Sequence, residues 1–377
     1  MGVGWRLFYR RGLYDLSGTQ ALFFQAMTEN VRHHMACCPD YAAILRHCGF
    51  SPDDLHTPDD LYKIPPLPTL LLKRRALYSA PPERLLFRST TSGTSGAVSE
   101  MGLDLPSAAR GFGMVLTTLL THRILSPRPA DFVVLGYQPT RRNRIGAVKT
   151  AYAMTFTAPS LHRVYALRDT GDTYALNFDE IRAALLRCER RRRPVRFIGF
   201  PAYFFFFLQT LAREGVQLRL HPKSRVFLAG GWKQFFAEQV DRPALCALSA
   251  RVLGLGDAYI REFFGAVEHP IAYFDCPNHH FHVPIYTRVL IRDVSTLAPV
   301  GYGTPGLLNL LTPMITSMPF ASILTDDLAV LRAGSSCGCG ISSPYFDVLG
   351  RVGLSDIKTC AASAAELLAD LGKGGHL

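Results

Sequence analysis

VRFIGFPAYFFFFLQTLAREGVQLRLHPKSRVFLAGG, residues 195–231, contains a strand, a helix and a second strand in one continuous stretch. VRFIGF is an apolar run of strand length, and AYFFFFLQTLAREG has the length of a helix that is closed by Gly215. RVFLAGG then predicts the next strand. The order strand, helix, strand is typical of an α/β domain whose mainly parallel strands are covered by helices.

The same alternation precedes this stretch. DFVVLGY (131–137) predicts another apolar strand, and the segments 104–125 and 178–193 predict helices. The second of these helices begins with acidic residues and ends with arginines, as the helix dipole favours. The aromatic run YFFFFL (203–208) has two interpretations, packing in the core or lining an apolar channel, and core packing is favoured.

The remaining segments suggest how the chain is divided. Residues 19–48 predict two helices separated at Pro39, and the proline-rich segment 51–73 predicts an extended connector. Beyond residue 250, short strands and turns predict a smaller β-rich subdomain over about residues 260–349. We therefore expect one large domain over residues 1–349, followed by a short vestigial C-terminal segment over residues 350–377.

Composition and charge limit the classes of function. The chain has 377 residues, of which 48% are hydrophobic, and its formal net charge of +11 favours an anionic partner. The arginine run 190–193 is interpreted as the solvated end of a helix, so no nucleic-acid partner is expected. Nine cysteines and no secretory leader indicate reduced thiols and a cytoplasmic location, and the longest apolar runs are too short for a membrane span.

A hydroxyl-rich loop follows the predicted strand LLFR (85–88). Its residues are Thr91, Ser92, Gly93, Thr94, Ser95 and Gly96. Glycines allow the backbone to fold tightly, so that N–H groups and hydroxyls converge on the oxygens of a phosphate. The loop lacks the lysine of a Walker motif, and a flexible connector is the alternative interpretation.

Three later segments occur in a definite order along the chain. They are Phe264-Gly265-Ala266-Val267-Glu268, Thr325-Asp326-Asp327 and Gly350-Arg351. With the hydroxyl-rich loop, they resemble the phosphate-binding loop, the aromatic-Gly-x-Thr-Glu motif, the Thr-x-Asp motif and the Gly-Arg turn of the acyl-adenylate-forming superfamily. The resemblance implies the large α/β domain of those enzymes, with helix-covered, mainly parallel sheets.

The closer resemblance is to the acyl-protein synthetase (LuxE-type) family. It is carried by GFPAYFF (199–205), AGGWK (229–233), CPNHHFHVP (276–284) and CGCG (337–340), and it extends over nearly the full length. Phenylacetate-CoA ligases share the central motifs. Because only 26 residues follow Arg351, the C-terminal domain of the superfamily and its catalytic lysine are expected to be truncated here.

The resemblance implies roles for the residues that match the motifs. The hydroxyl-rich loop would hold the β- and γ-phosphates of ATP. Glu268 would act in catalysis by binding Mg²⁺, which prefers carboxylate and phosphate oxygens. Phe264 would lie against the adenine. The family pattern places three glycines in the same nucleotide-binding set: Gly230, Gly231 and Gly265.

Two further positions would face the sugar and the reacting phosphate. On the same resemblance, Asp327 would accept hydrogen bonds from the ribose hydroxyls, and Arg351 would lie nearby as a catalytic cation. Val267 replaces the threonine that the superfamily usually has, so one hydroxyl near the substrate carboxylate or the α-phosphate is missing. This departure, with the missing lysine, makes a non-catalytic binding protein one alternative.

Two sets of cysteines have chemistry of their own. Thiolates and imidazoles are the ligands of structural zinc, and a candidate Zn²⁺ site consists of Cys276, Cys337 and Cys339 with either His280 or His282. His282 is preferred, because its spacing from Cys276 resembles that of the Cys and His pair in the relatives. Unmetallated thiols in a subdomain core are the alternative.

Cys360 lies beside Lys358 at the predicted start of the last helix, where the helix dipole and a cation lower the pKa of a thiol. The resembling family carries its acyl group on a cysteine near the C-terminus. Cys360 is therefore the candidate acyl carrier, and an inert thiol is the alternative.

These residues together predict ATP-dependent activation of a carboxylic acid, with a fatty acid favoured. The acyl group would pass from the acyl-adenylate to Cys360 and then to a partner protein, such as a reductase or a carrier. Adenylation of an aryl or other acid, followed by transfer to coenzyme A or into a small-molecule pathway, is the other enzymatic alternative.

Overall fold

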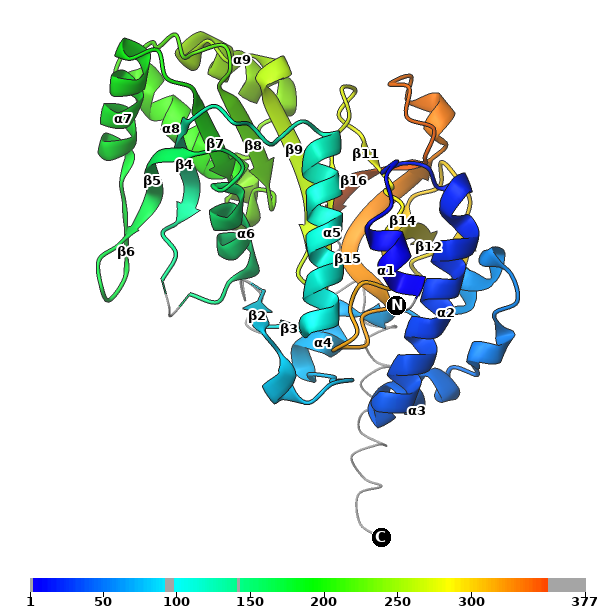
Figure 1. Ribbon diagram of the computed structural model, residues 1–377. Coiled ribbons are helices and arrows are strands. Elements are labelled where there is room, and N and C mark those ends of the chain that lie inside the picture. The colour runs from blue at the N-terminus through cyan, green and yellow to red at the C-terminus, as the bar shows by residue number, and fades with distance from the viewer. Residues whose placement is uncertain (1–2, 92–97, 141–142, 352–377) are drawn as a thin grey trace. The chain divides into compact units, whose positions relative to one another are not determined.

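The computed structural model describes residues 3–91, 98–140 and 143–351 (Figure 1). The predictions for Ser92–Gly96, for Cys360 and for the truncated C-terminal segment therefore concern residues outside the described ranges, apart from Gly350 and Arg351. Contacts between residues divide the chain into two units. The first unit comprises Met1–Thr121 and Ala266–Leu377, and the second unit is His122–Gly265.

The second unit contains the parallel sheet that the sequence predicts. Its strands are β4 (Ala130–Tyr137), β5 (Ser160–Asp169), β6 (Tyr174–Leu176), β7 (Val195–Gly199), β8 (Arg225–Ala229) and β9 (Ile260–Ala266). They lie in the order β9-β8-β7-β4-β5-β6, and every neighbouring pair is parallel except β5 with β6. The helices are α6 (Gly146–Met154), α7 (Phe178–Arg190), α8 (Pro201–Arg213) and α9 (Arg242–Leu253), with a 3₁₀ segment at Lys233–Glu238. Strand and helix alternate, so the predicted α/β architecture is confirmed.

The core of the second unit contains part of the aromatic run of α8. Phe204 and Phe207 are fully buried and pack with Phe197 of β7 and with leucines of α7 and α8. Phe205 is only partly buried. Phe204 and Phe207 therefore pack in the core, which is the favoured interpretation of the aromatic run.

The first unit is built on a sheet of different character. Its order is β11-β16-β15-β14-β12-β13, all antiparallel, and β1 pairs with β15 in parallel. The strands are β1 (Leu67–Pro68), β11 (Phe281–His282), β12 (Arg288–Arg292), β13 (Pro299–Val300), β14 (Gly306–Leu311), β15 (Ser322–Arg332) and β16 (Tyr345–Arg351). The short strands predicted beyond residue 250 are therefore present and mainly antiparallel.

Helices and a hairpin complete the first unit. The helices are α1 (Val3–Phe8), α2 (Gln20–Cys37), α3 (Pro39–His47), α4 (Thr69–Arg74) and α5 (Leu105–Thr121), with 3₁₀ turns at Ser17–Thr19, Pro52–Asp54, Pro58–Lys63, Pro82–Arg84 and Gly334–Ser336. The hairpin consists of β2 (Phe87–Thr90) and β3 (Glu100–Leu103). As predicted, the first two long helices are separated at Pro39. Among the described residues, no helix is both long enough and apolar enough to span a membrane.

Two elements of the first unit differ from the prediction. α4 lies in the segment predicted as an extended connector, because burial of Leu71 and Leu72 stabilises a helical turn that the nearby prolines concealed. β3 separates the hydroxyl-rich loop from α5, so the loop joins two antiparallel strands rather than a strand and a helix. A four-residue strand with one charged residue carries too weak a pattern to be recognised from sequence.

Candidate functional site

Asp327 and Arg351, the predicted ribose ligand and its neighbouring cation, meet in the first unit. They are cross-strand partners on β15 and β16, and Arg351 Nε donates to Asp327 Oδ1 at 3.1 Å. The Asp327 side chain is largely buried, and the backbone N–H of Asp327 donates to Thr325 Oγ1 at 3.2 Å. Burial raises the pKa of Asp327 above its ordinary value, and Arg351 opposes that rise. The pair is thus a fixed carboxylate with one charged partner.

Asp326, the preceding residue, makes contacts of a different kind. It accepts a hydrogen bond from Thr69 Oγ1 at 3.0 Å and forms an ion pair with Lys73 Nζ at 3.4 Å. Successive side chains of a strand point to opposite faces, so Asp326 ties α4 to β15 while Asp327 faces away from α4. The two adjacent carboxylates therefore have separate structural roles.

Glu268, the predicted Mg²⁺ ligand, lies in a two-residue turn. The turn Val267–Glu268 connects β9 to β10 (His269–Phe274). Glu268 is only 4% exposed, and its side chain has no hydrogen bond or ion pair with any residue in the ranges 3–91, 98–140 and 143–351. Burial of an unpaired carboxylate is costly, and a bound cation removes that cost. The residue is therefore suited to hold a divalent metal.

A buried polar network that the sequence did not reveal lies directly after Glu268. His269 Nε2 contacts the hydroxyl of Tyr273 at 2.8 Å, and that hydroxyl is 2.9 Å from Thr287 Oγ1. Burial lowers the pKa of His269 to about 3, so the imidazole is neutral near pH 7. The network links the start of β10 to the start of β12 and restrains the strand that follows the Glu268 turn.

The predicted phosphate loop is described only at its base. The backbone N–H of Thr91 donates to the Ser99 carbonyl at 3.1 Å, and the N–H of Ser99 donates to Thr91 Oγ1 at 2.9 Å. These two bonds continue the β2–β3 hairpin by one residue pair, so they hold the two ends of the loop together. Thr91 is thereby placed where the loop begins.

Four of the predicted nucleotide-binding residues belong to the second unit. Gly230 and Gly231 follow β8 with φ angles of +81° and +63°, a backbone conformation that side chains with a Cβ rarely adopt. Phe264 and Gly265 lie near the end of β9. Both pairs therefore lie at the carboxyl ends of parallel strands of the same sheet. Ligands of α/β proteins commonly bind at these ends.

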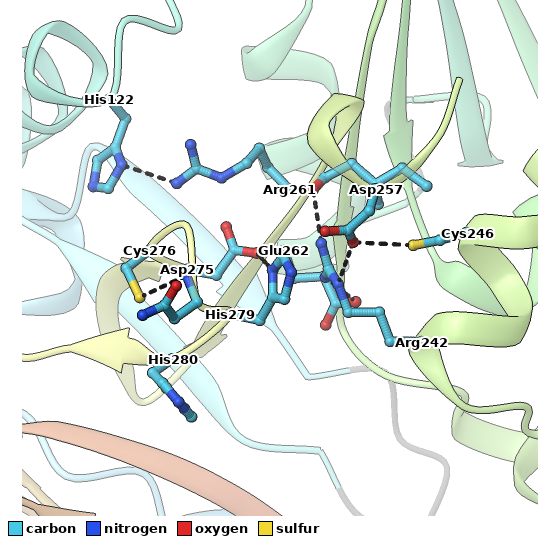
Figure 2. Close-up of polar contacts among 12 residues, drawn as sticks. His122, Arg242, Cys246, Asp257, Arg261, Glu262, Asp275, Cys276, His279 and His280 are labelled. Atoms are coloured by element: carbon cyan, nitrogen blue, oxygen red, sulfur yellow. Dashed lines mark hydrogen bonds and ion pairs between the residues drawn. The ribbon is translucent and has the colours of Figure 1, made fainter. Parts of the chain in front are cut away.

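An arginine cluster holds the start of β9 (Figure 2). Arg242 pairs with Asp257 through Nε at 3.0 Å and with Glu262 through Nη1 at 2.8 Å, and Nη2 donates to the Ile260 carbonyl at 2.8 Å. Cys246 Sγ lies 3.2 Å from the same Asp257 oxygen. Burial and the hydrogen bond to Asp257 raise the pKa of the Cys246 thiol to about 12. The cluster was not predicted, and it positions the strand that leads to Phe264.

The four predicted zinc ligands come together in the first unit. The ligand atoms of Cys276, His282, Cys337 and Cys339 all lie within 4.8 Å of one another. Cys276 Sγ is 3.5 Å from Cys337 Sγ, and Cys339 Sγ is 3.2 Å from His282 Nε2. Zn–S bonds of about 2.3 Å in a tetrahedron separate the sulfurs by about 3.8 Å, so the spacing fits a zinc ion. The predicted proximity of these residues is confirmed.

Neighbouring groups orient the ligands of this cluster. His282 Nδ1 donates to the Ser343 carbonyl at 2.8 Å, which leaves the lone pair of Nε2 facing Cys339. The backbone N–H of Asn278 donates to Cys276 Sγ at 3.3 Å. Burial, followed by hydrogen bonds with Cys339 and Cys276, raises the pKa of Cys337 to about 12. Without a cation this thiol stays protonated, whereas a metal ion would stabilise its thiolate.

Comparison with known proteins identifies the family. Residues 14–369 match the family model described as acyl-protein synthetase, LuxE. The chain belongs to this family. It is 26% identical over 323 residues to a long-chain-fatty-acid--luciferin-component ligase of Aliivibrio fischeri, covering 84% of this chain and 81% of the relative. It is 25% identical over 320 residues to the ligase of the same name from Vibrio harveyi, covering 84% and 82%.

Solved structures identify the fold. A 2-hydroxyisobutyryl-CoA ligase in an open conformation superimposes with a TM-score of 0.67 at 15% identity, covering 90% of this chain and 76% of that one. The predicted adenylate-forming fold is therefore confirmed. As a member of the acyl-protein synthetase family, the chain is a ligase that activates a carboxylic acid with ATP and transfers the acyl group.

The described cysteines differ in their access to an acyl group. Cys37 and Cys48 are exposed, whereas Cys38, Cys188 and Cys246 are buried. Burial, the largest cause, raises the pKa of each of these three buried thiols, which keeps them protonated. Cys37 and Cys48 are therefore accessible to an acyl group, so a test of Cys360 as the acyl carrier has to include variants of both.

Proposed function

We propose that this protein uses ATP and Mg²⁺ to activate a long-chain fatty acid and passes the acyl group to Cys360 and then to an acceptor protein. The observation that carries the proposal is Glu268, a buried carboxylate without a partner in the described part of the chain, within an aromatic-Gly-x-x-Glu motif. The names of the two ligase relatives support the fatty acid and the protein acceptor.

The first half-reaction forms the acyl-adenylate. An oxygen of the fatty-acid carboxylate attacks the α-phosphorus of ATP, and pyrophosphate leaves. When bound, Mg²⁺ neutralises charge on the phosphates, and Glu268 holds it. The loop that begins at Thr91 binds the β- and γ-phosphates, and its other members are Ser92, Gly93, Thr94, Ser95 and Gly96.

The remaining nucleotide contacts come from the other family motifs. Asp327 accepts hydrogen bonds from the ribose hydroxyls, and Arg351 balances its charge. Phe264 lies against the adenine. The glycines that let the backbone approach the nucleotide are Gly230, Gly231 and Gly265.

The second half-reaction transfers the acyl group. The Cys360 thiolate attacks the acyl carbonyl carbon, a thioester bond forms, and AMP leaves with the electron pair of the broken C–O bond. Attack by a thiol of the acceptor then moves the acyl group onward and returns Cys360. In this scheme Cys276, His282, Cys337 and Cys339 would hold a zinc ion that has a structural role, because four protein ligands would leave no open position for a substrate.

The carrier step is tested with radiolabelled fatty acid and ATP. We expect a hydroxylamine-sensitive label on the wild type and background label on Cys360→Ser, with acid-dependent pyrophosphate exchange within about twofold of wild type. Cys37→Ser and Cys48→Ser are the matched controls, because both thiols are exposed, and both variants should keep the label. Full labelling of Cys360→Ser, or free acyl-CoA as the main product when coenzyme A is added, would contradict the carrier role.

The adjacent carboxylates of β15 provide a second test. Asp327→Asn should raise the KM for ATP about tenfold, because a neutral amide replaces a charged acceptor for the ribose hydroxyls. Asp326→Asn is the control: it should lower the free energy of unfolding by about 1 kcal/mol, through its contacts to Thr69 and Lys73, and leave the KM unchanged. If Asp327→Asn had the same KM for ATP as the wild type, the proposal that Asp327 binds the nucleotide would be wrong.

A further inference from the structure

A surface depression of the second unit has no role in the chemistry above. Its volume is about 570 Å³, and it is lined by residues 125–127 and 156–160 and by Arg163 of β5. Among the residues that the structure describes, none of those predicted to bind nucleotide or metal lines it. The depression is therefore a candidate for a second binding surface.

Arg163 is held rigidly at this depression. Its Nε donates to Thr155 Oγ1 at 2.8 Å, and Thr155 Oγ1 in turn donates to the Tyr152 carbonyl at 2.7 Å. The guanidinium carbon is 5.0 Å from the ring centroid of Phe156 and 6.0 Å from that of Tyr152. Across the described ranges, no carboxylate forms an ion pair with Arg163. A fixed guanidinium without an acidic partner is pre-organised for a carboxylate from outside.

Large apolar side chains accompany this cation at the surface. Phe156 is 62% exposed and Leu125 is 38% exposed, and both line the depression. Tyr152, which packs edge-on against Phe156 with ring centroids 5.3 Å apart, is also exposed. Exposed aromatic and aliphatic side chains beside an arginine are typical of the energetic centre of a protein–protein interface.

The stretch of sequence that contains all the lining residues is strongly basic. Residues 122–168 contain eight lysines and arginines but one carboxylate, a surplus of seven positive charges in a chain whose net charge is +11. That carboxylate, Asp131, is buried and accepts a hydrogen bond from Cys188 Sγ at 3.0 Å. It therefore does little to offset the surface charge, and the segment attracts negatively charged partners.

We infer that this depression is the docking site of a partner protein that presents an acidic segment with one large apolar side chain. The apolar side chain enters the depression between Leu125 and Phe156, and a carboxylate pairs with Arg163. A concave site accommodates a protruding side chain better than it does the flat surface of a bilayer. The identification of this partner with the acyl acceptor rests on the proposed function, whereas the docking surface itself does not.

The test measures fluorescence anisotropy with three labelled peptides. EEFLEE carries acids and an apolar anchor, KKFLKK keeps the anchor and reverses the charge, and EEGGEE keeps the charge without the anchor. We expect EEFLEE to bind at least about tenfold more tightly than either other peptide at physiological salt. Arg163→Gln and Phe156→Ala should each weaken its binding about tenfold.

Matched controls separate a defined site from diffuse charge. Arg213→Gln on α8 and Leu186→Ala on α7 remove an exposed arginine and an exposed leucine from the same unit, and both should bind EEFLEE as the wild type does. Equal binding of all three peptides, or equal losses in the control variants, overturns the proposal. Thermal unfolding of each variant shows that it is folded, and Phe156→Ala replaces a mostly exposed side chain and so tests the site independently of Arg163.

Two further measurements separate protein docking from membrane binding and from adenylation. Binding to phosphatidylserine vesicles that is lost in Arg163→Gln and in Phe156→Ala, without specific binding of EEFLEE, would assign the surface to a membrane and overturn the proposal. Pyrophosphate exchange by Arg163→Gln should equal that of the wild type. If the wild type showed no exchange, the proposed function would fail while the peptide result still decided the docking site.

Discussion

Glu268→Gln is expected to lower fatty-acid-dependent exchange of pyrophosphate into ATP by about 10²–10³-fold, because in the proposed role a neutral amide is a much weaker ligand of Mg²⁺ than a carboxylate. The variant keeps the size of the side chain, so the turn Val267–Glu268 should fold as before. The loss should persist at high Mg²⁺ concentration. A Mg²⁺ ion without its protein ligand would be bound weakly and would also be misplaced relative to the phosphates of ATP.

Stability measurements distinguish this role from a structural one. Glu268 has no partner among the described residues, so its replacement should not lower the free energy of unfolding of the metal-free protein. Glu262→Gln is the matched control on β9, because Glu262 forms an ion pair with Arg242. That control should reduce stability by about 1 kcal/mol and keep its exchange activity. Exchange by Glu268→Gln within about threefold of wild type would show that another group holds the metal.

Cys339→Ser is expected to abolish stoichiometric zinc and to lower the free energy of unfolding by about 3–5 kcal/mol. Cys339 is the best position for this change because it is the least buried of the three thiols, so the effect reports loss of a ligand rather than of core packing. Zinc content per chain and thermal unfolding in the presence of a chelator provide the measurements. Cys48→Ser, at an exposed thiol outside the cluster, should change neither quantity.

The opposite result would support the alternative of unmetallated thiols. Protein that is purified without zinc, and that unfolds at the same temperature with and without a chelator, would show that Cys276 and Cys337 are ordinary core thiols. The position of His282 argues against that outcome, because its Nδ1 is committed to the Ser343 carbonyl and its Nε2 faces Cys339. This orientation is the usual one for a histidine that binds a metal through Nε2.

Prediction from the sequence succeeded where the decisive pattern is local. β4, β7 and β8 are short apolar runs, and α7 has acidic residues in its first turn and arginines in its last, so each element is recognisable on its own. Two of the elements that escaped prediction, β3 and α4, carry weak patterns. β3 has four residues, and α4 is hidden among prolines and depends on the burial of its leucines.

The candidate site shows the same division. The motif residues and the candidate zinc ligands could be named from the sequence, because their residue types are unusual and their order along the chain resembles a known family. The network of His269, Tyr273 and Thr287 has no such signature, since histidine, tyrosine and threonine at these spacings are common in any strand region. The role that we propose for Arg163 was equally invisible in the sequence, because it depends on Arg163 having no ion pair with a carboxylate of the described residues.

By itself, the amino-acid sequence determined the alternation of strands and helices, the family, and the residues that are candidates for binding ATP and metals. These depend on apolar runs and on motifs that are contiguous in the chain. Only the tertiary structure decided which polar groups are paired and which are not: Asp327 is held by Arg351, the four candidate zinc ligands converge, and the Glu268 side chain remains without a partner in the described part of the chain. Pairing is a property of groups brought together by folding across tens of residues, so no local pattern encodes it.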